Sequence, residues 1–107
     1  MTIRALLIDD DPDTRALLAL ALSSDGRFTV EAMSRFDAAS ELHRDAAGYD
    51  ALLVHLLESE GEGAALITAI RQWAPALPIV TLGAAGTIAK PVDPLALPTQ
   101  LAEMLEA

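Results

Sequence analysis

The sequence predicts an α/β fold in which short parallel strands alternate with helices. Four short apolar runs, at residues 3–8, 28–33, 51–55 and 78–82, have the length and composition of strands. Each of the first three is followed by a segment of helical length, an alternation typical of a parallel sheet. The chain has 107 residues, enough for one hydrophobic core, so we treat residues 1–107 as a single domain.

The first strand, IRALLI at residues 3–8, ends at three consecutive aspartates. Asp11 is suited to cap a helix that has Pro12 in its first position and Asp13 in its first turn. We expect this helix to end near Gly26.

Two further helices are predicted over residues 37–46 and 64–73, the second ending ahead of Pro75. Near the carboxyl terminus Pro98 leaves two alternatives. It would fall at the fifth position of a helix beginning at Asp93-Pro94, where it removes a hydrogen bond and kinks the helix. The other alternative is a helix from Pro98 to Glu106.

Composition excludes several classes of function. The formal net charge is −9, from 16 acidic and 7 basic residues, so no basic footprint for nucleic acid is present. No apolar run approaches the ~20 residues that span a membrane. The absence of cysteine excludes disulfides and thiolate sites and fits a cytoplasmic protein.

Polar residues stand at the carboxyl ends of two predicted strands. Asp9 and Asp10 follow the first strand, and His55 ends the third. Right-handed crossovers place these ends on one edge of a parallel sheet, where such folds keep their sites. Asp9, Asp10 and His55 could form a transition-metal site, or His55 could be inert. His43, in the middle of a predicted helix, is expected at the surface.

In these features the chain resembles the receiver domains of bacterial two-component response regulators. The resemblance covers nearly the whole length and rests on five pieces: LLIDDDPDTRALL at 6–18, YDALLVH at 49–55, Gly63, LPIVTL at 77–82 and KPVD at 90–93. It implies a flavodoxin-like fold, a three-layer α/β/α arrangement with a five-stranded parallel sheet.

Some positions match the functional residues of that family. The resemblance implies that Asp9 and Asp10 correspond to the acidic pair that holds magnesium. Lys90 and Pro91 match the lysine that pairs with the phosphate and the proline that follows it.

Three other positions depart from the family pattern. His55 stands where the family has its phosphoacceptor aspartate, Gly83 where it has Ser or Thr, and Thr87 where it has an aromatic switch residue. Magnesium prefers oxygen ligands to imidazole, so we expect weak divalent-metal binding at most, through Asp9 and Asp10, and no other cofactor.

The topology departs as well. Residues 84–89 alone separate Gly83 from Lys90, whereas a parallel crossover needs roughly a dozen residues. Six residues reach at most about 22 Å. We therefore expect the fourth helix of the family to be missing, its fifth strand to be vestigial or absent, and a core sheet in the order 2-1-3-4.

The resulting hypothesis is a stand-alone pseudo-receiver, a protein-interaction module that works without phosphoryl transfer. Its expected partners are an unidentified signalling protein and a second copy of itself. A homodimer would cover the side left open by the missing helix. The expected interface residues are Ile79, Val80, Leu82, Leu97, Leu101 and Leu105.

The sequence leaves two other functions as alternatives. One is a ligand or metal sensor that uses the pocket of Asp9, Asp10 and His55. The other is a phosphatase, because Asp9-x-Asp11 is similar to a haloacid-dehalogenase motif. That motif requires Thr or Val at position 13, which is Asp here, and the chain lacks room for the cap domain of such phosphatases. We therefore expect that the protein is not an enzyme.

Overall fold

The computed structural model describes residues 2–55, 61–82 and 93–106. They contain a four-stranded parallel sheet in the order β2-β1-β3-β4, which confirms the predicted strand order. The strands are β1 (Ile3–Ile8), β2 (Phe28–Met33), β3 (Ala51–His55) and β4 (Ile79–Leu82). Strand pairing is in register along β1, from Ile3 opposite Phe28 to Ile8 opposite Met33.

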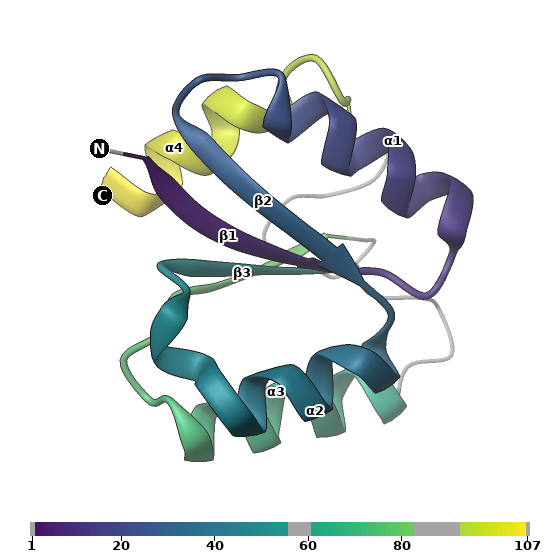
Figure 1. Ribbon diagram of the computed structural model, residues 1–107, viewed down its shortest axis with the longest axis vertical. Helices are drawn as coiled ribbons and strands as arrows, with labels where there is room; N and C mark the ends of the chain where they lie inside the picture. Colours follow the sequence, from purple (N-terminus) through teal and green to yellow (C-terminus); the bar gives the residue numbers. More distant parts are fainter. Residues whose placement is uncertain (1, 56–60, 83–92, 107) are drawn as a thin grey trace.

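Helices cover both faces of this sheet, giving the three-layer arrangement expected (Figure 1). The helices are α1 (Pro12–Ser23), α2 (Arg35–Asp45), the short 3₁₀ helix η1 (Ala46–Gly48), α3 (Gly61–Trp73) and α4 (Leu97–Glu106). Figure 1 shows α1 and α4 on one face and α2 and α3 on the other.

Alternation along the strands builds two cores. Ala5 and Leu7 of β1 face α1 and α4, whereas Leu6 and Ile8 face α2 and α3. All four are at most 2% exposed, as expected for a central strand covered on both faces. The buried run of β1 ends at Ile8, so Asp9 and Asp10, which follow it, lie at the edge of the sheet.

The helix starts follow from their caps. The side chain of Asp11 accepts a hydrogen bond from the backbone N–H of Asp13, which confirms it as the cap of α1. Helix α2 begins at Arg35, two residues before the predicted start, because Ser34 caps it by accepting from the N–H of Asp37. Helix α1 ends at Ser23, earlier than expected.

Pro98 is the second residue of α4 and therefore interrupts no hydrogen bond. Ahead of it, the carbonyl of Asp93 accepts from the N–H groups of Ala96 and Leu97. The carboxylate of Asp93 accepts from the N–H of Leu95. Residues 93–96 thus form a turn, and the alternative with a helix starting at Pro98 is correct to within one residue.

The expectation of an uncovered β4 and final helix is wrong for four of its six residues. Val80, Leu82, Leu97 and Leu101 are at most 5% exposed within one chain. Helix α4 lies on the same sheet face as α1, and these side chains pack there with α1 and β3 in one core cluster. Their burial needs no second copy. Ile79 and Leu105 are partly buried.

The predictions about residues 83–89, a missing helix and a vestigial strand, lie outside the described residues. In the ranges the structure describes, no helix is long and apolar enough to cross a membrane.

Candidate functional site

Asp9 is buried at the carboxyl end of β1. Asp9 is 1% exposed and is the one buried charged residue in the described part of the chain. Its Oδ1 accepts from the backbone N–H of Asp11 at 2.9 Å, and its Oδ2 lies 2.9 Å from Nδ1 of His55. Its carbonyl oxygen accepts from the Arg15 guanidinium at 2.8 Å. Each oxygen of this buried residue therefore has a donor, as burial of a carboxylate requires.

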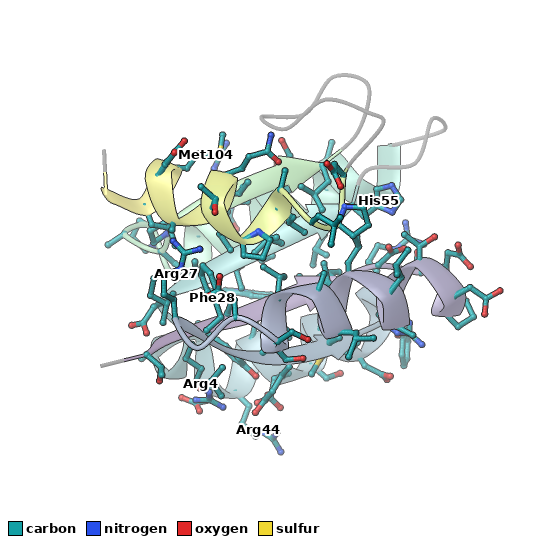
Figure 2. All side chains as sticks on the ribbon, turned by 90° about the horizontal axis from the view of Figure 1, so that it is seen from above. Arg4, Arg27, Phe28, Arg44, His55 and Met104 are labelled. Carbon is teal, nitrogen blue, oxygen red and sulfur yellow. The ribbon has the colours of Figure 1, made fainter. Side chains whose placement is uncertain are left out.

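His55 supplies one of those donors from β3. β1 and β3 are paired, so the ends of the two strands are neighbours, as predicted. The His55 side chain is 10% exposed. A carboxylate only accepts hydrogen bonds, so Nδ1 carries its proton whether the ring is neutral or charged. Figure 2 shows His55 at the end of the sheet opposite Arg4 and Arg27.

Asp10 points to a different element. Its Oδ1 accepts from the backbone N–H of Arg35 at 2.8 Å, and its Oδ2 lies 3.3 Å from Nη2 of the same residue. Arg35 is the first residue of α2. The carboxylates of Asp9 and Asp10, adjacent in sequence, thus diverge toward β3 and α2.

Asp11 serves the fold. Besides capping α1, its carboxylate accepts from the Thr14 hydroxyl. That hydrogen bond lowers the pKa of Asp11 below its usual value. Asp11 therefore stays ionised as the cap, which is the role the sequence predicted.

The arrangement does not fit a divalent metal held by Asp9 and Asp10. Magnesium demands near-octahedral oxygen ligands, and these carboxylates face separate donors. Within residues 2–55, 61–82 and 93–106, no three His, Cys, Asp or Glu side chains come together as a group that could hold a metal ion. The structure joins Asp9 with His55 and turns Asp10 away, so the transition-metal alternative is not formed here.

Four predicted site residues, Gly83, Thr87, Lys90 and Pro91, lie outside the described part. Sequence reasoning missed Arg35. Its position two residues after β2 places it at the same edge of the sheet as Asp10, and that was the available signal.

A second candidate site is an apolar groove between α1 and the turn that begins α4. Its volume is about 440 Å³, and it is lined by Leu17, Leu20, Ala21, Ser24, Asp25, Pro94, Leu95 and Pro98. Leu17, Leu20 and Leu95 are 53%, 65% and 91% exposed. They are three of the five large apolar side chains exposed in the described residues, so the exposed apolar surface is concentrated here.

Comparison with known proteins identifies the family. The family model of the response regulator receiver domain matches residues 5–102. The chain belongs to this family. It is therefore a receiver domain of two-component signalling, and the flavodoxin-like fold implied by the resemblance is confirmed.

A relative found by sequence similarity supports the assignment to the receiver family. This receiver domain is 35% identical over 83 residues to the transcriptional regulatory protein GlrR of Escherichia coli K12, covering 78% of this chain and 18% of GlrR. The chain thus spans under a fifth of that relative's length.

Solved structures share the fold at lower identity. A CheY-like response regulator receiver domain protein from Methanospirillum hungatei JF-1 superposes with a TM-score of 0.81 at 20% identity, covering 99% of this chain and 95% of that one. NtrX from Brucella abortus has a TM-score of 0.78 at 23% identity, with 98% and 27% covered.

Proposed function

We propose that this receiver domain is a pseudo-receiver, which acts without aspartyl phosphorylation as a protein-interaction module in cytoplasmic signalling. The observation that carries the proposal is the hydrogen bond between His55 and Asp9. The side chain at the family's phosphoacceptor position is an imidazole, and it is engaged with the neighbouring strand end.

The chemistry supports this reading. An acyl phosphate forms when a carboxylate oxygen attacks phosphorus, and an imidazole cannot yield that product. Asp9 is a poor substitute nucleophile because it is 1% exposed and both of its oxygens are engaged. Asp10 is held by the backbone and side chain of Arg35.

The groove between α1 and α4 supports the interaction role. Leu17, Leu20 and Leu95 offer an exposed apolar surface that an amphipathic helix of a signalling protein would cover. The net charge of −9 favours a partner whose groove-flanking residues are basic, because complementary charge speeds encounter. A second copy of the chain is the competing occupant.

Phosphorylation is tested with acetyl phosphate and magnesium, read by intact mass. We expect no adduct, while a receiver domain with an aspartate at the acceptor position is modified under the same conditions. A stoichiometric adduct mapped to Asp9 or Asp10 would contradict the proposal.

The groove is tested by co-purification from cells that express the chain. Leu20→Asp places a charge in the groove, and Phe36→Asp makes the same change at a side chain 82% exposed on α2. A protein retained by the wild type and Phe36→Asp but lost with Leu20→Asp supports docking at the groove. Equal retention by all three would exclude it, and concentration-dependent sedimentation abolished only by Leu20→Asp would identify the partner as a second copy.

A further inference from the structure

We infer that the carboxylates of Asp9 and Asp10, at the end of β1, receive hydrogen bonds from the chain's own donors in place of a divalent cation. His55 is the residue that prevents magnesium from binding there. Replacing His55 by a carboxylate should therefore create a magnesium site. This inference concerns the ion chemistry of the strand ends and does not depend on the proposed interaction role.

The first step concerns Asp9. A buried carboxylate needs compensating donors, and Asp9 obtains one from the Asp11 N–H and one from Nδ1 of His55. Nδ1 of His55 carries a proton in this arrangement and has no lone pair, so toward Asp9 His55 is a donor and supplies no oxygen ligand for magnesium.

The second step concerns Asp10. Two donors of Arg35 hold its carboxylate toward the start of α2. Arg35 lies two residues after β2, and β2 pairs with β1 on the side away from β3. To share a metal ion, Asp9 and Asp10 must both turn, and each must give up a charge-assisted hydrogen bond. The donors of both hydrogen bonds belong to the chain itself, so they compete with magnesium for the two carboxylates at every magnesium concentration.

The third step compares His55 with an aspartate at the same place. Aspartate offers only acceptors, so Asp9 would lose a donor and face a second carboxylate on the neighbouring strand. Two carboxylates on these paired strand ends repel each other. A divalent cation relieves that repulsion, and it then finds oxygen ligands on β1 and β3 together.

The test compares His55→Asp with its matched control His43→Asp, which makes the same substitution at an exposed position of α2. Thermal unfolding is measured in MgCl₂ and in NaCl of equal ionic strength. At a magnesium concentration about ten times its Kd, the unfolding temperature of His55→Asp should rise by roughly 6 °C. The wild type and His43→Asp should not respond.

Two results would overturn the inference. One is a saturable shift of the Asp9 or Asp10 amide signals of the wild type with magnesium. The other is a folded His55→Asp that magnesium leaves unchanged. If His55→Asp stays unfolded even in magnesium, His55→Asn decides, because asparagine offers a neutral oxygen ligand. A folded His55→Asn as indifferent to magnesium as the wild type would equally refute the role of His55.

Discussion

Removing the imidazole in His55→Ala should lower the free energy of unfolding by about 1.5 to 3 kcal/mol, the range for a hydrogen bond to a charged group. The structure supports a value in that range because the carboxylate of Asp9 is buried and loses one of its donors. The Asp11 N–H remains to Oδ1, so the carboxylate is not stripped of all partners.

For a chain of 107 residues, that loss corresponds to an unfolding temperature lower by roughly 7 to 13 °C. Urea unfolding followed by circular dichroism gives the free energies of the wild type, His55→Ala, Asp9→Ala and the double variant. The coupling energy from this cycle should exceed about 0.5 kcal/mol, as contacting residues normally show.

His43→Ala is the matched control. His43 is exposed on α2, as predicted, and its ring centroid lies 5.2 Å from that of Trp73. Its loss should cost no more than about 0.5 kcal/mol. If His55→Ala were as mild as this control, or its coupling to Asp9 were zero, the structural importance assigned to the pair would be refuted.

Two further predictions concern the core and the pH dependence. Leu101→Ala should lower the free energy of unfolding, measured in urea, by about 2 to 5 kcal/mol, because Leu101 is fully buried within one chain. A loss below about 1 kcal/mol would instead favour the hypothesis that Leu101 lies in an exposed interface. Hydrogen bonds from the Tyr49 hydroxyl and the Arg4 guanidinium lower the pKa of Glu31 below its usual 4.5. Its contribution to stability is therefore complete above that pH and is lost as the pH falls through the lowered value. Glu31→Gln should flatten the acid side of the stability profile, and an unchanged slope would argue against this contribution.

The sequence alone determined the features that depend on neighbours along the chain. The apolar runs gave β1 and β3 their bounds, because central strands covered on both faces are largely apolar. The edge strand β2 also has its predicted bounds, although it is only partly buried. Asp11 and Pro12 announced the start of α1, since a cap acts on the next few residues. The start of α2 is set by an equally local signal, because Ser34 caps the helix from the residue directly before it.

The order of the strands was also within reach, because crossover handedness and connection length restrict the arrangements of a parallel sheet. The same rules placed Asp9 and His55 at adjacent strand ends, and the structure bears this out.

Only the tertiary structure decided which donors the two aspartates use. Asp9 finds His55 46 positions away, and Asp10 finds Arg35 25 positions away. It also decided that α4 covers Leu97 and Leu101 within one chain, where the sequence suggested a partner. A carboxylate at a strand end can turn toward any donor within reach, and which donors are in reach is set by packing among elements far apart in sequence.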